Sequence, residues 1–402
     1  MAVGGNRLDW FPIEGIELNT LAAGIRYQNR EDLLLIRCDP ATTLAGMWTR
    51  NHFPAAPVVL AKAHYAKGCA RYLLINTGNA NAATGAAGME DAVLCCQLIA
   101  AAEGAPVSAV LPFSTGVIGE RLPIERFQAS ATALVAGLGE KTWLDAARAI
   151  MTTDTRQKIA CRELHLGGQT IRVTGIAKGA GMIQPNMATM LCFIGCDAKV
   201  GQETLQDMLR AAADSSLNRI TVDSDTSTND AVVLMATGRS GVDLDQDLEA
   251  QTAFQDALTD LMLELAQALV RDGEGATKFV TVQVDGAETN EQALEIAFSV
   301  ANSPLIKTAL FAGDANWGRL AMAVGKVATP FDASRVDLFI GEVCLMRRGI
   351  KNPLYEEADG ARVMAAEEVL LRVDLNAGDC SETVWTSDLS HEYIKINAEY
   401  RT

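Results

Sequence analysis

Apolar runs and period-two patterns along the chain predict several β-strands. Short apolar runs of strand length occur at residues 33–36, 72–75, 190–194 and 232–235, and a shorter apolar run lies at 110–111. Over residues 278–284 valines occupy every second position, which is the pattern of a strand with one buried face.

Helical patterns lie between these runs. Residues 205–213 and 254–269 place apolar side chains at i, i+3 and i+4 spacing. Thr289 and Gln292 resemble a capping box that opens a helix over 290–302. Residues 89–102 are apolar almost all round, which predicts a buried helix. The alternation of strands and helices predicts a layered α/β structure.

The chain has 402 residues, which is long for one ordinary core and favours two domains, or one large sandwich with an appendage. With 49% apolar and 21% charged residues, it has the material for a substantial core. Turn residues at Asp285-Gly286 suggest a catalytic α/β domain over 1–285 and a smaller C-terminal α+β domain over 286–402.

The net charge of -16 disfavours nucleic acid and anionic membranes as partners. No apolar run reaches the roughly 18 residues that span a bilayer, and the N-terminus has no apolar signal-peptide core. Nine scattered cysteines without a CxxC pair favour free thiols in a reducing cytoplasm, without a structural zinc site. We expect no metal and no bound cofactor.

The most informative segment for chemistry is residues 178–191, which read KGAGMIQPNMATML. Gly179 and Gly181 permit backbone conformations closed to other residues, and a Pro-Asn pair signals a turn. Thr189 then precedes the apolar run at 190–194. A threonine at the mouth of a buried strand can be a pinned nucleophile, although a turn leading into a core strand fits the same residues.

Other catalytic patterns fail on inspection. The four histidines (His52, His64, His165 and His391) have no GxSxG elbow to serve. Residues 137–142, GLGEKT, lack the spacing of a phosphate loop and fit a helix end followed by a loop. The acidic stretch 223–230 lacks the glycine and distal glutamate of an EF-hand, so a hydrogen-bonded loop is the better interpretation.

Two further polar segments follow predicted strands, where sites are common. They are NTGNANAATG at 76–85 and Ser114-Thr115-Gly116. A glycine N–H beside a threonine hydroxyl can supply two donors to one oxygen. Ordinary turn chemistry is the alternative for both segments.

Eight colinear blocks together resemble the ornithine acetyltransferase family of self-processing glutamate N-acetyltransferases, which serve arginine biosynthesis. The resemblance covers essentially the whole chain, and Ala180 and Ser224 are small departures where the family commonly has Ser and Gly. The blocks are NTGNANAATG at Asn76, PFSTGVIGE at Pro112, MTTDT at Met151, KGAGMIQPNMATML at Lys178, DTSTND at Asp225, DGEGATKF at Asp272, FAGDANWGR at Phe311 and INAEYRT ending at Thr402.

The resemblance implies an α/β/β/α sandwich of the self-processing aminopeptidase and ornithine acetyltransferase type. It implies that the Ala188–Thr189 bond is cut autocatalytically and that Thr189 becomes the nucleophile. The new α-amino group, with a reference pKa of about 7.7–8.0, would act as its base. Thr115 and Gly116 resemble the oxyanion hole of the family.

The family also implies the substrates and a ping-pong transfer. N2-acetyl-L-ornithine would acetylate Thr189, and L-glutamate would then accept the acetyl group; bifunctional members also use acetyl-CoA as a donor. The processed enzyme would be a heterotetramer of two α and two β chains. The matching substrate-binding positions are Thr152, Lys178, Thr189, Glu274, Asn397 and Thr402.

Two other functions remain open on the sequence. A self-processing aminopeptidase or amidase of related fold would share the nucleophile and pass the acyl group to water. A non-catalytic binding protein could keep the fold without the chemistry. Glutamate-dependent turnover distinguishes the first, and an unbroken, inactive chain would favour the second.

Overall fold

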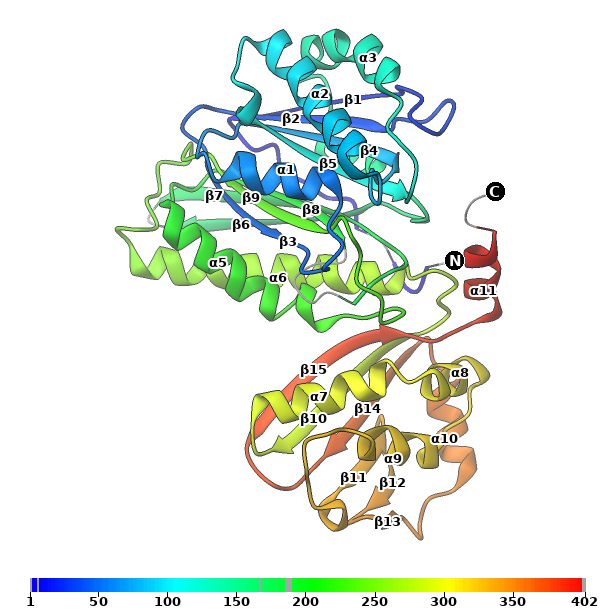
Figure 1. Ribbon diagram of the computed structural model, residues 1–402. Coiled ribbons are helices and arrows are strands. Elements are labelled where there is room, and N and C mark those ends of the chain that lie inside the picture. The colour runs from blue at the N-terminus through cyan, green and yellow to red at the C-terminus, as the bar shows by residue number, and fades with distance from the viewer. Residues whose placement is uncertain (1, 6, 167, 185–189, 400–402) are drawn as a thin grey trace.

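The computed structural model describes residues 2–5, 7–166, 168–184 and 190–399 (Figure 1). Within these residues the chain forms three β-sheets with helices on their faces. Two sheets stack against each other, and the third belongs to a separate C-terminal unit.

The first sheet has the strand order β1-β2-β4-β5, with antiparallel pairs except for the parallel β4 and β5. Leu33 and Leu35 on its outer face pack against Ile99 and Leu134 of the covering helices. The strands are β1 (Ile16–Leu21), β2 (Leu33–Cys38), β4 (Tyr72–Asn79) and β5 (Val110–Val117). The helices beside them are α1 (Ala56–Tyr65), α2 (Gly85–Glu103) and α3 (Ile124–Ala136).

The second sheet has the order β3-β9-β8-β7-β6, in which β8 and β9 run parallel. Its outer face is covered by α5 and α6, whose apolar stripes include Leu209 and Leu261. The elements are β3 (Thr43–Trp48), β6 (Lys158–Leu166), β7 (Gln169–Lys178), β8 (Leu191–Cys196), β9 (Ala231–Ala236), α5 (Gln202–Asp214) and α6 (Leu248–Arg271).

The inner faces of these two sheets form a shared core. Ile36 and Ile75 of the first sheet meet Phe193 and Val233 of the second, together with α4 (Trp143–Ala149). The rings of Phe113 and Phe193 pack edge to face across the layers, with centroids 5.2 Å apart. The expected α/β/β/α sandwich is therefore confirmed.

The C-terminal unit is a six-stranded sheet in the order β13-β12-β11-β14-β10-β15 with its own core. The expected boundary at 285–286 falls inside β10, which pairs with both β14 and β15. The division stays a proposal, and strand pairing favours a position before Phe279. The strands are β10 (Phe279–Ala287), β11 (Asp337–Ile340), β12 (Val343–Arg347), β13 (Ile350–Lys351), β14 (Glu368–Asp374) and β15 (Cys380–Ser387).

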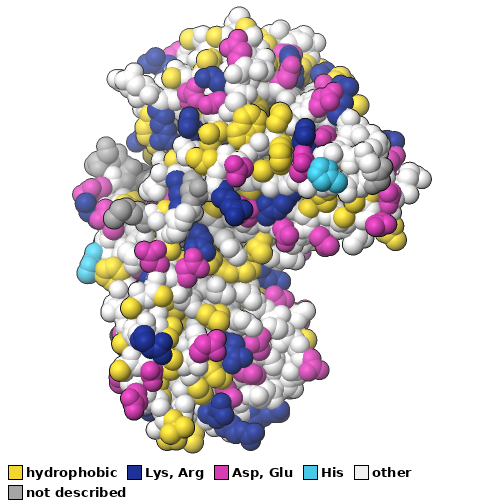
Figure 2. Space-filling view, turned by 180° about the vertical axis from the view of Figure 1, so that it is seen from behind, with side chains coloured by type: hydrophobic (Ala, Val, Ile, Leu, Met, Phe, Trp, Pro, Cys, Tyr) yellow, Lys and Arg dark blue, Asp and Glu magenta, His cyan; other side chains and the backbone are white. Residues whose placement is uncertain are grey.

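The helices of this unit lie around its sheet, except α11, which lies beside the sandwich (Figure 1). They are α7 (Asn290–Ala301), α8 (Pro304–Ala312), α9 (Trp317–Gly325), α10 (Glu357–Met364) and α11 (His391–Ala398). Short 3-10 turns occur at Val107–Ala109, Leu217–Arg219 and Ala333–Arg335. From behind, the unit forms a narrower lobe than the sandwich, and acidic and basic side chains are interspersed over both (Figure 2).

Most predicted elements are confirmed, and two of the predicted helices differ from expectation in detail. The helix expected to be buried all round, α2, is buried along one face only. The sequence pattern did not distinguish the two faces, because many alanines make the exposed face apolar as well. Although α2 is long and apolar enough to cross a membrane, its buried face packs on the first sheet as a core helix does. At α7, Thr289 caps Gln292 as predicted, but the Gln292 side chain reaches the Glu288 N–H instead of closing the box.

Candidate active site

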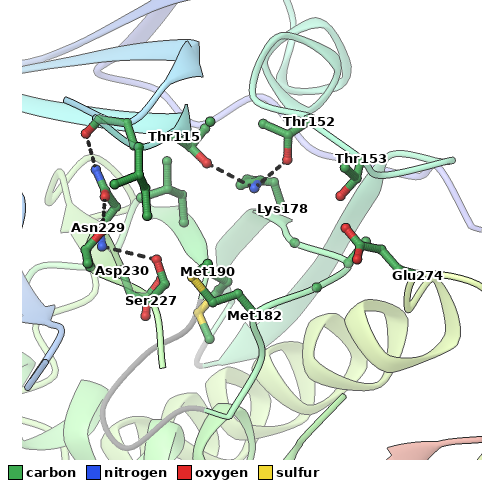
Figure 3. A pocket seen from close by; sticks show the side chains of 18 of the residues that line it. Thr115, Thr152, Thr153, Lys178, Met182, Met190, Ser227, Asn229, Asp230 and Glu274 are labelled. Carbon is green, nitrogen blue, oxygen red and sulfur yellow. Dashed lines mark hydrogen bonds between the residues drawn. The ribbon is translucent and has the colours of Figure 1, made fainter. Parts of the chain in front are cut away.

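A pocket of about 200 Å³ opens where β5, β7, β8 and β9 meet the loops of the sandwich (Figure 3). Met190 and Leu191, which immediately follow Thr189, are part of its wall. Six residues expected at the site line the pocket: Thr115, Gly116, Thr152, Lys178, Glu274 and Asn397. The other three predicted positions, Ala188, Thr189 and Thr402, lie outside the described residues.

Lys178 links two threonines on the pocket wall. Its ammonium Nζ donates to Thr115 Oγ1 at 3.1 Å and to Thr152 Oγ1 at 2.8 Å. Since the Thr115 oxygen accepts this bond, its own O–H is left to donate elsewhere. Burial lowers the pKa of Lys178, against the opposing effect of the Asp154 charge. The arrangement supplies a positive charge and a hydroxyl donor on one wall.

Gly116 is required by the close approach of two strands. Its φ of 135° lies in a region that favours glycine, and an added Cβ would lie 2.2 Å from the carbonyl carbon of Gly78. The sequence placed Thr115 in a loop after a strand, but β5 continues through Val117. Strand pairing with β4 thus fixes the backbone that carries Thr115.

A buried ion cluster that the sequence analysis missed lies behind Lys178. Lys158 Nζ is 2.6 Å from both Asp154 Oδ1 and Asp272 Oδ2, and all three side chains are at most 1% exposed. Asp154 also accepts from the backbone N–H groups of Thr152 and Gly179. The cluster therefore anchors the chain on both sides of the Lys178–Thr152 contact.

The charges in this cluster control the ionisation of Asp154. Burial alone would raise the pKa of Asp154, but the charges of Lys158 and Lys178 outweigh burial and hold the pKa well below its usual value. A carboxyl with a lowered folded-state pKa stabilises the fold above its unfolded pKa. That stabilisation is lost as the pH falls through the lowered value.

Replacing Lys158 by methionine should lower the free energy of unfolding by about 3–5 kcal/mol, because two buried carboxylates lose the ammonium group that contacts both of them. Denaturant unfolding at neutral pH measures this change. Lys199→Met is a matched control, since that lysine pairs with Asp243 on the surface and its loss should change little. Equal stability of the two variants would contradict a supporting role for the cluster.

Glu274 and Asn397 form the opposite end of the pocket. Asn397 Nδ2, on α11, donates to Glu274 Oε2 at 2.8 Å, and the Glu274 N–H donates to the Ala180 carbonyl at 2.8 Å. An added Cβ at Gly181 would lie 2.4 Å from Glu274 Oε2, so a larger residue there would displace the carboxylate. The C-terminal helix thus brings a polar group into a site built mainly by the sandwich.

The acidic stretch 223–230 is a hydrogen-bonded loop, as predicted. Asp223 accepts from the N–H groups of Met182 and Ile183, at 2.6 and 2.8 Å, and so holds the segment that leads toward the proposed cleavage site. Asn229 donates to the carbonyls of Ala80 and Ser114. Within the part of the chain that the structure describes, no cluster of potential metal ligands occurs.

The predicted alternatives to this site also have structural explanations. His64 is buried, with Nδ1 2.7 Å from the Val110 carbonyl, and no histidine is among the described residues of the pocket wall. Residues 137–142 run from the end of α3 to Thr142, which caps α4. The segment is therefore a helix end followed by a loop, as expected.

The model of the ArgJ family matches residues 17–402. The chain belongs to this family. It is 51% identical over 408 residues to the arginine biosynthesis bifunctional protein ArgJ of Pseudomonas syringae pv. tomato, and 50% identical over 406 residues to that of Pseudomonas fluorescens. Both matches cover 100% of this chain and of the relative.

A solved structure of ornithine acetyltransferase complexed with ornithine, from Mycobacterium tuberculosis, is 35% identical. The match covers 44% of this chain and 94% of that chain, with a TM-score of 0.40. The family model and the full-length ArgJ relatives confirm the predicted family. They also confirm the predicted class, which is an acetyltransferase of arginine biosynthesis.

Proposed function

We propose that this pocket transfers the acetyl group of N2-acetyl-L-ornithine to L-glutamate through an acetyl ester on Thr189. The observation that carries the proposal is the contact of Lys178 with Thr115 and Thr152 on a wall that continues into Met190. It sets a hydroxyl donor and a cation beside the residue that follows the proposed nucleophile. The remaining assignments rest on the family.

The proposed cycle begins with cleavage of the chain. The Thr189 hydroxyl attacks the Ala188 carbonyl carbon, the peptide becomes an ester, and water releases the two chains. The freed α-amino group then takes the hydroxyl proton when Thr189 attacks the acetyl carbonyl of the donor, and gives a proton to the departing ornithine nitrogen. The same steps in reverse then transfer the acetyl group from Thr189 to the amino nitrogen of glutamate.

The described residues of the pocket would stabilise the oxyanion and bind the substrate. Thr115 and the Gly116 N–H stabilise the tetrahedral oxyanion. Lys178, whose pKa burial lowers, attracts a substrate carboxylate and disfavours protonation of the neighbouring amine. Glu274 binds an ammonium group of ornithine, and Asn397 holds that carboxylate in place.

The direct test is to incubate the wild-type protein with N2-acetyl-L-ornithine, with and without L-glutamate, and to follow free ornithine and N-acetylglutamate. Stoichiometric formation of both products is expected only when glutamate is present. Ornithine release at the same rate without glutamate would instead indicate the related amidase. Acetyl-CoA in place of acetylornithine tests the second donor of a bifunctional enzyme.

Replacing Glu274 by alanine should raise KM for N2-acetyl-L-ornithine by about 10- to 100-fold, the effect of losing a charged hydrogen bond. Self-cleavage should persist, because it needs no bound amino acid. Steady-state kinetics and a denaturing gel measure the two effects. Glu392→Ala, at an exposed position of α11, is the matched control. Equal loss of cleavage and transfer would mean that Glu274 is structural.

We also propose a cytoplasmic location and a heterotetramer of two α and two β chains. All nine cysteines are free thiols, which suits a reducing compartment. Burial raises the pKa of Cys38 and of Cys196 to about 12, so these two are unreactive core residues. The mass of the processed protein in solution tests the assembly.

A further inference from the structure

We infer that Asp230 binds the amino nitrogen that gives up or receives the acyl group in this pocket. This role rests on the proposed acyl transfer. Asp230 has no part in the catalytic steps proposed above. Asp230 lies between the loop 223–229 and β9, and it lines the pocket (Figure 3).

The carboxyl group of Asp230 is incompletely satisfied. The residue is 3% exposed, and its Oδ2 atom is buried without a hydrogen-bond partner among the described residues. A buried acceptor left unpaired costs stability, so its presence in a pocket wall points to a ligand that supplies the missing donor. An N–H of an amine or an amide is such a donor.

The position of Asp230 identifies which nitrogen it would meet. The N–H of Ala231 donates to the carbonyl of Met190 at 3.0 Å, so Asp230 stands beside the first described residue after the proposed nucleophile. Glu274 lies on the other side of Lys178 in the same pocket (Figure 3). A diamino acid would then place its distant ammonium at Glu274 and its reacting nitrogen at Asp230.

The ionisable groups of the pocket fit this assignment. The described wall contains three of them: Asp230 on the β9 side, Lys178 on β7, and Glu274 after α6. Burial raises the pKa of Asp230 well above its usual value, and hydrogen bonds from Ser227 and the Lys178 charge offset burial only in part. Without a positive partner the carboxyl therefore keeps its proton over a wider pH range. A substrate ammonium favours the charged carboxylate, so the carboxyl proton is released to solvent on binding and Oδ2 becomes free to accept the N–H bond.

The test uses processed Asp230→Asn protein, which keeps the shape of the side chain and removes its charge. After acetylation by N2-acetyl-L-ornithine, the acetyl-enzyme is offered L-glutamate or water alone. We expect kcat/KM for glutamate to fall about 10- to 100-fold, as for a lost hydrogen bond to a charged group, whereas hydrolysis by water should change less than about threefold. Because Asp230 binds the amine as a carboxylate, kcat/KM of the wild type should rise as the pH increases through the raised pKa of Asp230, and this rise should disappear in the variant.

Stability provides a second measurement. Burial raises the pKa of Asp230 in the native state above its unfolded value, so between these two values only the native state keeps the proton and the wild type becomes less stable as the pH rises. Asp230→Asn should match or exceed the wild-type melting temperature above neutral pH. The matched control is Asp225→Asn, in the same loop but outside the pocket wall, which should leave transfer unchanged.

Three outcomes would overturn the inference: unchanged glutamate kinetics, an equal loss of aminolysis and hydrolysis, or a variant that fails to cleave itself. The last outcome would tie Asp230 to chain cleavage, in which no substrate amine takes part. A wild-type enzyme that fails to transfer acetyl groups at all would reject the proposed function itself, independently of the variant.

Discussion

Replacing Thr189 by alanine should leave a single 42.9 kDa chain and reduce acetyl transfer by on the order of 10⁶-fold, as when other covalent nucleophiles are removed. Wild-type protein should instead yield fragments 1–188 and 189–402. Alanine has no hydroxyl to attack the Ala188 carbonyl, and an uncut chain has no free α-amino group to act as base. A denaturing gel with N-terminal sequencing measures cleavage.

Thr189→Ser is the matched control for this substitution. Serine keeps the attacking oxygen, so this variant should still cut between 188 and 189 and should retain transfer at a reduced rate. Cleavage of Thr189→Ala at the same bond would show that another group is the nucleophile. Cleavage of the wild type elsewhere would reject the assigned junction.

The sandwich could be predicted because its strands are continuous apolar runs. The runs at 33–36 and 232–235 correspond to β2 and β9, which are buried on both faces between helices and the opposing sheet. Hydropathy failed where polar residues complete a strand. Asn76 and Thr77 belong to β4, where their backbones pair with β5. Their buried side chains are accommodated because they donate to the carbonyls of Asn79 and Ala149. Such partners depend on the tertiary fold and leave no local pattern.

The candidate site divides in a similar way. Residues within recognisable motifs, such as Lys178 and Glu274, could be named from the sequence. Asp154, Lys158 and Asp272 could not be grouped, because 114 residues separate Lys158 from Asp272 and each residue alone resembles a surface charge. The significance of Asp230 likewise depends on an unpaired oxygen that only the packed structure reveals.

Replacing Thr115 by alanine should lower kcat for acetyl transfer by about 10²–10³-fold, with little change in KM, in protein that has already been processed. The Thr115 oxygen accepts from Lys178, so its proton can be donated to an oxygen that becomes negative only in the transition state. Losing that donor raises the barrier by roughly 2.7–4 kcal/mol. Binding of the uncharged acetyl group needs the donor far less.

Two control variants separate this catalytic effect from a loss of stability. Thr115→Ser keeps the hydroxyl and should recover most of kcat. Thr221→Ala removes a buried threonine whose hydroxyl bonds Asn302 outside the pocket wall, and should lower the melting temperature without lowering kcat. If Thr115→Ala behaves like Thr221→Ala, Thr115 only completes the packing of β5. A low kcat with an unchanged melting curve would instead place its hydroxyl at the oxyanion, where both self-cleavage and transfer require it.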